Sequence, residues 1–205
     1  MNKRQITYGL KALSRADSDL AEAITIFGAP QPRVRPQGFE TFLGTIVSQQ
    51  ISTAAAAAIM GRVRTLLPSC TPEGLDQVSD AALRAAGLSF RKIEYVRGLA
   101  HAEQTGALQV DALGALSDEE AIERITALRG FGVWSAESYL MFSLGRKDVF
   151  PAGDLALQVA LGRLKSLDAK PTPSEARALT EHWAPWRSVG ALFLWHYYQG
   201  APVSG

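Results

Sequence analysis

Several features that would assign a chemistry are scarce in this chain of 205 residues. It has one cysteine, Cys70, so it can form neither an intramolecular disulfide nor a four-cysteine iron–sulfur cluster. Its three histidines, His101, His182 and His196, are too scattered for a zinc site. We therefore expect chemistry without a metal or another cofactor.

Long apolar runs and a surplus of charge are also missing. No stretch approaches the roughly 18 apolar residues of a membrane span, and the N-terminal segment lacks the apolar core of a signal peptide, so we expect a cytoplasmic protein. The net charge is +1, whereas nucleic-acid-binding domains usually carry a basic excess. A local basic strip at Arg84–Arg97 is equally typical of a solvated helix face.

Helix start and stop signals are abundant, and no segment has the pattern of a strand. Ser117 with Glu120 and Thr172 with Glu175 fit the capping box, and Gly87 fits a helix C-cap. Apolar periodicity indicates a helix within residues 153–164. We predict an all-α protein, with further helices near residues 37–48, 53–67, 90–104, 133–144, 173–183 and 187–198 and with breaks at Pro68, Pro72, Pro151 and Pro185.

The stretch LRGFGVWSA, residues 128–136, sets two glycines one residue apart between apolar runs. A dinucleotide fingerprint would need a preceding strand and a third glycine, where Ser135 stands. A helix, a tight turn and a second helix fit better. Gly130 and Gly132 can take positive φ, and their amides, with that of Val133, can bind a phosphate. A C-cap glycine followed by a loop glycine explains the motif equally well when it is taken alone.

The same stretch, followed by DVFPAGDLALQ at residues 148–158, resembles the helix-hairpin-helix (HhH-GPD) superfamily of DNA glycosylases. The AlkA-like DNA-3-methyladenine glycosylase II branch is the most similar. Residues 38–59 and 183–198 resemble further segments of this family. The resemblance implies a two-lobed helical fold with an active-site cleft between the lobes, in the short form without the N-terminal α/β domain. The central lobe would span about residues 37–145, and the second lobe about 1–36 with 146–205.

This resemblance also implies an activity, namely base excision repair by a monofunctional DNA glycosylase. Such an enzyme flips alkylated purines of the 3-methyladenine and 7-methylguanine class out of double-stranded DNA and excises them, leaving an abasic site. Trp134 stands where relatives with lyase activity have a nucleophilic lysine. The resemblance therefore implies that this protein lacks lyase activity. We expect a monomer. The alternatives are a glycosylase for deaminated or ethenylated bases and a non-catalytic DNA-binding module.

By register with the family, Asp154 is the catalytic carboxylate, which would stabilise the positive charge that develops on the sugar. Asp154 also precedes a helix, where aspartate is a common N-cap, and the two roles are compatible. The nearby Asp148 is assigned a structural role, as are Trp186 and Arg187.

The family register also implies a pocket in which Trp134 and Trp195 stack on the flipped base. A cationic alkylated purine is attracted to the face of an indole. The aromatic candidates for the rest of the wall have a helical spacing that fits core packing equally well. These wall candidates are Ser138, Tyr139, Phe39 and Phe42.

Flipping leaves a gap in the duplex that an inserted side chain fills. The register implies that this wedge is Gln50, with Ile51 as the alternative and Gln49 beside them. A polar loop between two helices explains the same residues. The hairpin amides would bind phosphate with the help of Arg129, and further phosphate contacts are implied for Arg91 and Lys92.

Overall fold

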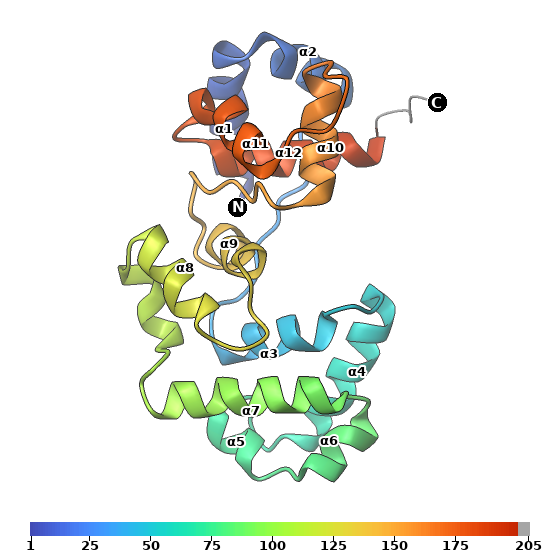
Figure 1. Cartoon of the computed structure of the whole chain (residues 1–205), viewed down its shortest axis with the longest axis vertical. Coiled ribbons are helices and arrows are strands. Elements are labelled where there is room, and N and C mark those ends of the chain that lie inside the picture. Colours follow the sequence, from blue (N-terminus) through green and yellow to red (C-terminus); the bar gives the residue numbers. More distant parts are fainter. Residues whose placement is uncertain (201–205) are drawn as a thin grey trace. The chain divides into compact units, whose positions relative to one another are not determined.

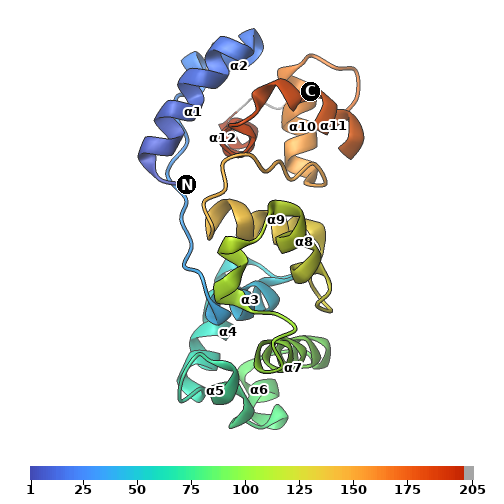
Figure 2. The same cartoon turned by 90° about the vertical axis from the view of Figure 1, so that its left-hand side faces the viewer.

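The computed structural model describes residues 1–200, and all regular secondary structure in that range is helical (Figures 1 and 2). The prediction of an all-α protein is therefore confirmed. The helices are α1 (Lys3–Ala16), α2 (Ser18–Phe27), α3 (Phe39–Ser48), α4 (Thr53–Leu66), α5 (Pro72–Asp76), α6 (Asp80–Ala86), α7 (Phe90–Gln104), α8 (Asp118–Thr126), α9 (Val133–Phe142), α10 (Leu155–Leu164), α11 (Pro173–Leu179) and α12 (Arg187–Gly200), with the 3-10 helices η1 (Val110–Ala115) and η2 (Glu181–Trp183).

Side-chain caps set the starts of most of these helices. The Ser117 hydroxyl accepts a hydrogen bond from the Glu120 amide at 3.2 Å, and the Glu120 carboxylate accepts one from the Ser117 amide at 2.9 Å. Thr172 and Glu175 form the same reciprocal pair. Gly87 ends α6 with a φ of 111°. Both predicted capping boxes and the glycine C-cap are confirmed, because each depends only on residues within one turn.

Some elements differ from the sequence-based expectation. Helices α1, α2 and α5 and the 3-10 helix η1 were not predicted. The helix expected over residues 173–183 ends at Leu179, and the chain continues into η2. Pro72 does not only break structure, since it is the first residue of α5, where a missing backbone N–H costs nothing. In α1 only Ile6, Gly9, Leu10 and Leu13 are buried, so its apolar stripe is narrow.

The chain divides into two compact units, and unit 1 contains residues 1–34 together with the chain from Glu137 onward. Helix α12 contacts α1, α2, α10 and η2, and α11 packs against α10 and η2 (Figure 1). Burial of apolar side chains from these helices forms the unit's core. Its members include Leu13, Leu20, Leu157, Leu161, Trp183 and Phe193.

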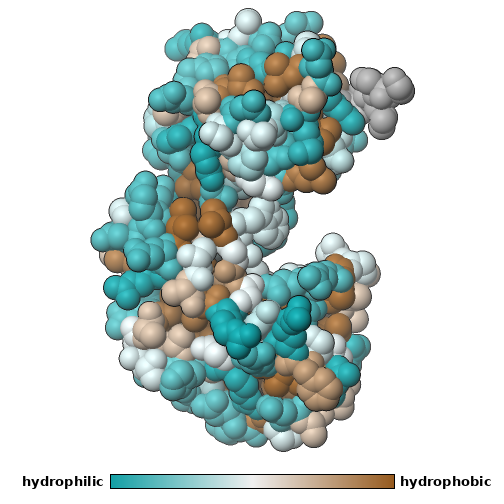
Figure 3. All heavy atoms as spheres, in the orientation of Figure 1, coloured by the Kyte–Doolittle hydropathy of each residue, from teal (hydrophilic) through white to brown (hydrophobic). Residues whose placement is uncertain are grey.

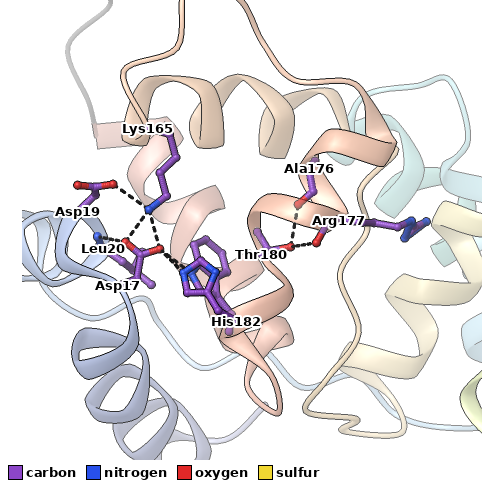
Figure 4. Close-up of polar contacts among 9 residues, drawn as sticks. Asp17, Asp19, Leu20, Lys165, Ala176, Arg177, Thr180 and His182 are labelled. Atoms are coloured by element: carbon purple, nitrogen blue, oxygen red, sulfur yellow. Dashed lines mark hydrogen bonds and ion pairs between the residues drawn. The ribbon is translucent and has the colours of Figure 1, made fainter.

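A buried polar cluster around Asp17 joins three parts of unit 1 (Figure 4). The Asp17 carboxylate accepts hydrogen bonds from Lys165 Nζ at 2.7 Å and from Trp183 Nε1 at 2.7 Å. It also accepts one from the Leu20 amide at 3.2 Å, and His182 Nε2 lies 3.0 Å away. Burial by itself would raise the pKa of Asp17, but these partners together lower it to about 2. The carboxylate therefore ties the junction of α1 and α2 to the end of α10 and to η2.

Unit 2 contains residues 35–136. Helix α7 packs against α3, α5 and α6, and α4 packs against α3 and α6 (Figure 2). The chain then passes through η1 and α8 to the glycine-containing turn before α9. The division between the units falls inside α9, so Val133–Ala136 are counted with unit 2. The core of unit 2 includes Phe42, Leu43, Ile46, Val63, Leu83 and Val96.

Hydrophilic residues cover most of the face of each unit that Figure 3 shows. Between residues 1 and 200, no helix combines the length and apolar character needed to cross a membrane. Large apolar side chains are exposed at a few positions of unit 2, among them Ile51, Phe90, Val133 and Trp134.

Candidate active site

Asp154 lies in unit 1 as the N-cap of α10. Its Oδ1 accepts a hydrogen bond from the Leu157 amide at 2.9 Å, so the predicted capping role is confirmed. The same oxygen accepts a hydrogen bond from Trp195 Nε1 at 3.2 Å. Two donors from different helices therefore orient a half-buried carboxylate at the positive end of a helix.

Trp195 is held in turn by its neighbours on unit 1. Its ring centroid lies 5.7 Å from that of Phe142, with an angle of 36° between the ring planes. The guanidinium carbon of Arg33 lies over the Phe142 ring, 4.6 Å from its centre. The indole thus has a packed position from which its N–H reaches Asp154.

In unit 2, the turn between α8 and α9 depends on Gly130. This residue has a φ of 94°, and a Cβ added there would lie 2.4 Å from Cδ2 of Tyr95. Gly132 differs, because it does not take a positive φ and a Cβ there would meet no atom within 4 Å. The expectation that both glycines use positive φ is therefore wrong for Gly132. Its carbonyl accepts hydrogen bonds from the amides of Ser135 and Ala136, which starts α9.

We expect Gly130→Ala to lower the free energy of unfolding by about 1–3 kcal/mol, because alanine would have to hold a left-handed conformation against the Tyr95 ring. Gly132→Ala is the matched control, with an expected change below about 0.5 kcal/mol. Urea unfolding of both variants measures the difference. Equal losses at the two glycines would contradict the assignment of the turn to Gly130.

A groove of about 590 Å³ in unit 2 brings the predicted wedge residues and the hairpin together. Gln49 is half-buried and Gln50 is exposed, on the short connection between α3 and α4. Trp134, the second residue of α9, is 48% exposed and also lines this groove. Ile51, the alternative wedge, is exposed but does not line the groove. The residues that line the groove are Arg35, Thr45, Ser48, Gln49, Gln50, Ser89, Arg91, Lys92, Tyr95, Gly130, Trp134 and Ser135.

The basic residues predicted to contact phosphate differ in their surroundings. Arg129 is exposed and forms an ion pair with Glu94. Arg91 is exposed on the groove, whereas Lys92 Nζ donates to the Val47 carbonyl at 2.7 Å. Burial also lowers the pKa of Lys92. Part of the hydrogen-bonding capacity of Lys92 is thus used within the protein.

Residues 43–185 match the family model of the HhH-GPD superfamily of base excision DNA repair proteins. The chain belongs to the HhH-GPD superfamily. The family that the hairpin and the Asp154 segment predicted is thereby confirmed, and with it the hydrolysis of N-glycosyl bonds as the class of activity.

Individual HhH-GPD proteins are similar over most of this chain. It is 32% identical over 190 residues to DNA-3-methyladenine glycosylase 1 of Schizosaccharomyces pombe, a match that covers 89% of this chain and 83% of that protein. A crystal structure of DNA-3-methyladenine glycosidase from Bacillus halodurans has a TM-score of 0.85 at 37% identity and covers 94% of this chain and 89% of that one. The S. pombe 3-methyladenine DNA glycosylase in complex with abasic DNA has a TM-score of 0.82 at 31% identity, with coverages of 95% and 98%.

The candidate wall residues of this HhH-GPD chain are all buried. The ring of Phe42 lies 5.3 Å from that of Phe131 in the core of unit 2, and Phe39 and Tyr139 are also buried. Their burial indicates packing, so we do not assign these three rings to base contacts. Ser138 is buried as well, but its hydroxyl has no hydrogen-bond partner among residues 1–200. An unpaired buried hydroxyl is costly, which keeps Ser138 as a candidate ligand contact.

Asp148 has a structural environment in this HhH-GPD chain. Its carboxylate accepts two hydrogen bonds from the Arg187 guanidinium, both at 2.8 Å. These bonds hold the pKa of Asp148 below its usual range. The pair fastens the start of α12 to the segment before Asp154, and so supports both Asp154 and Trp195 from a distance.

One cavity of unit 1 lies away from these residues. It has a volume of about 650 Å³ and is lined in unit 1 by residues that include Phe27, Arg163 and Tyr197. None of the predicted site residues lines it. Its size alone therefore does not make it the active site of an HhH-GPD protein.

Sequence reasoning missed Glu137, the third residue after Trp134. Its side chain is 5% exposed, and Nη2 of Arg177 lies 3.4 Å from Oε1. Burial raises the pKa of Glu137 to about 7, although the nearby Arg177 opposes the shift. The only signal in the sequence is a carboxylate between apolar neighbours in the helical pattern of α9, and such a residue is more often at the surface.

The pKa of Glu137 implies a pH-dependent stability. The folded chain holds the proton more tightly than the unfolded chain, whose pKa is near 4.5, so the stabilising contribution is complete below that pH and is lost as the pH rises through 7. In the wild-type chain we expect the free energy of unfolding to fall by on the order of 2 kcal/mol between pH 5 and pH 8 because of Glu137. This fall should be absent in Glu137→Gln. Urea midpoints at both pH values measure it, with Glu22→Gln on the exposed side of α2 as the control. An identical pH dependence in wild type and Glu137→Gln would contradict this expectation.

Proposed function

We propose that this chain is a DNA glycosylase that flips alkylated purines, of the 3-methyladenine and 7-methylguanine class, out of duplex DNA and leaves an abasic site. The observation that carries the proposal is the Asp154 carboxylate, held by the Leu157 amide and the Trp195 indole in a member of the HhH-GPD superfamily. The names of its relatives as 3-methyladenine glycosylases support this substrate class, and one of them is bound to abasic DNA.

In the proposed reaction, the bond between C1′ of the deoxyribose and the purine nitrogen breaks, and its electron pair leaves with the base. Positive charge develops on the sugar, and the Asp154 carboxylate stabilises it electrostatically. Water then adds its oxygen to C1′, and the proton that it loses passes to Asp154 or to solvent. A purine alkylated at N3 or N7 is already cationic, so it departs as a neutral base and modest stabilisation of the transition state suffices.

The proposal includes no strand cleavage. Relatives that cleave the strand form a Schiff base between a lysine amine and the sugar. In this chain Trp134 stands at the position of that lysine, and an indole cannot form a Schiff base. We assign the exposed Trp134 ring to stacking on the extruded base. The positive charge of an alkylated purine adds a cation–π attraction to that contact.

The DNA backbone and the gap left by the base are assigned to unit 2. The amides of Gly130, Gly132 and Val133 bind a phosphate at the start of α9, with Arg129 beside them. The side chain of Gln50, exposed on the groove, fills the gap in the duplex.

The test is release of bases from defined duplexes by the full-length chain. Methylated duplex DNA reports 3-methyladenine and 7-methylguanine, and duplexes with hypoxanthine or ethenoadenine report the alternative lesions. Chromatography of the released bases gives the preference. The DNA strand is expected to remain intact until the abasic site is cut by hot alkali.

Each alternative has its own result in this assay. Release of hypoxanthine or ethenoadenine without release of methylated purines would replace the proposed substrate class. Tight binding to damaged DNA without any abasic product would indicate a binding module. Strand cleavage without alkali, together with trapping of a covalent complex by borohydride, would disprove the monofunctional assignment.

A further inference from the structure

The connection between α3 and α4, residues 49–52, is held in an uncommon conformation, and we call it the wedge loop. Helix α3 ends at Ser48, and Ser52 caps α4. Gln50 between them has a φ of 57°, in the left-handed region that residues other than glycine rarely adopt. Such a conformation persists only where the surrounding contacts determine it.

One of these contacts joins the wedge loop to the hairpin. Nε2 of Gln49 donates a hydrogen bond of 2.7 Å to the carbonyl oxygen of Gly130, a residue 81 positions later in the chain. Gly130 is itself fixed, because it lies against the Tyr95 ring with a φ that side chains disfavour. The residue directly before Gln50 is therefore attached to the rigid point of the phosphate-binding turn.

A second contact holds the other side of the loop. Lys92 of α7 donates from Nζ to the Val47 carbonyl at 2.7 Å, in the last turn of α3. Carbonyls in the last turn of a helix lack helical partners, and a cation there is favoured by the helix dipole. Lys92 thus caps α3 immediately before the wedge loop begins.

We propose that Gln49 and Lys92 are positioning residues, which hold the wedge loop against the hairpin so that the backbone that binds the phosphate also sets Gln50 for insertion. This inference rests on the proposed function, since it takes Gln50 as the wedge. Removal of either bond should let residues 49–52 leave the observed conformation. Base flipping should then suffer, while the chemical step at Asp154 is not directly affected.

Gln49→Met tests the bond at nearly constant side-chain volume. The substrates are two duplexes with a single 7-methylguanine, opposite cytosine or opposite thymine. A mismatched base costs less to unpair, so a flipping defect shrinks there. We expect the single-turnover rate to fall about tenfold opposite cytosine, as for the loss of one hydrogen bond, and by less than about threefold opposite thymine.

Further variants separate positioning from a general loss of structure. Gln49→Lys retains a donor of sufficient length and should recover most of the rate. Lys92→Met should show the same dependence on the mismatch, and it tests the proposal if Gln49→Met does not fold. The matched control is Gln77→Met, at an exposed glutamine of unit 2, with an expected rate equal to that of wild type. Thermal unfolding of every variant establishes that it is folded.

A double variant links the defect to the wedge. If Gln49 acts through Gln50, then Gln49→Met adds little to Gln50→Ala. Multiplied losses in the double variant, or equal losses on both duplexes, would overturn the proposal.

A readout without catalysis keeps the two proposals apart. Fluorescence of 2-aminopurine beside an abasic-site analogue reports unstacking when the chain binds. If wild type raises this fluorescence but releases no base, the proposed function fails while the loop proposal is still tested by the same variants. A wild-type chain that neither unstacks 2-aminopurine nor releases a base overturns both.

Discussion

Asp154→Asn is expected to lower the single-turnover rate of base release by at least about 100-fold while the fold and the affinity for DNA are retained. The amide oxygen of asparagine can still accept from the Leu157 amide and the Trp195 indole, at the positions where Oδ1 now does so. What the variant loses is the negative charge opposite the cationic sugar of the transition state. The substitution therefore separates the capping role of Asp154 from its proposed catalytic role.

The measurement is release of methylated purines under single-turnover conditions, together with binding to a duplex that holds an abasic-site analogue. Asp168→Asn is the matched control, since Asp168 is an exposed aspartate of the same unit. It should behave as wild type in both assays. If Asp154→Asn released bases within about threefold of the wild-type rate, the electrostatic role of Asp154 would be wrong.

Asp17→Ala is expected to lower the free energy of unfolding by about 3–5 kcal/mol, as for other buried ion pairs that lose one partner. The Asp17 side chain is 1% exposed and that of Lys165 is 16% exposed. Alanine would leave the ammonium of Lys165 and the indole N–H of Trp183 without their common acceptor. The expected loss of stability thus comes mainly from buried donors that no longer have an acceptor.

Asp19→Ala provides the contrast, because Asp19 binds the same ammonium at 2.8 Å but is 49% exposed. A half-exposed pair contributes below about 1 kcal/mol, so a small loss is expected on urea unfolding. If the two variants lost similar amounts of unfolding free energy, the buried cluster would contribute no more to stability than the exposed ion pair.

The acid dependence gives the Asp17 prediction a second measurement. The folded pKa of about 2 lies below the ordinary value of 3.8, so the ionised carboxylate stabilises the fold above pH 3.8 and this stability is lost as the pH falls through 2. Asp17→Ala should lack that part of the acid-induced loss.

Local signals explain which parts of the fold the sequence predicts well. Helix α7 spans residues 90–104 as predicted, and the capping boxes predicted for α8 and α11 are present. Helices α1 and α2 were not predicted, although Asn2 with Gln5 forms a capping box at the start of α1 and Asp17 caps α2. The early end of α11 depends on tertiary packing, since the Trp183 ring is buried within unit 1.

The candidate site likewise has features that the sequence predicted and features that only the structure showed. Gln49 and Gln50 were placed by motif register, but the bond from Gln49 to Gly130 joins residues 81 positions apart and has no local signature. The sequence pattern left Phe42 and Tyr139 open between core packing, which it favoured, and the pocket wall, and both side chains are buried. The sequence did not predict the raised pKa of Glu137, because that pKa depends on the burial that folding creates.

The sequence by itself determined the family, the all-helical class, the glycine turn and the aspartate at the start of α10, because each is read from short motifs whose residues lie close together in the chain. Only the tertiary structure decided that Gly130 and not Gly132 has a positive φ, that Trp195 donates to the oxygen of Asp154, and that Gln49 fastens the wedge loop to the hairpin. The physical reason is that these properties arise from contacts between segments distant in sequence, where burial and close approach set conformation, charge and orientation.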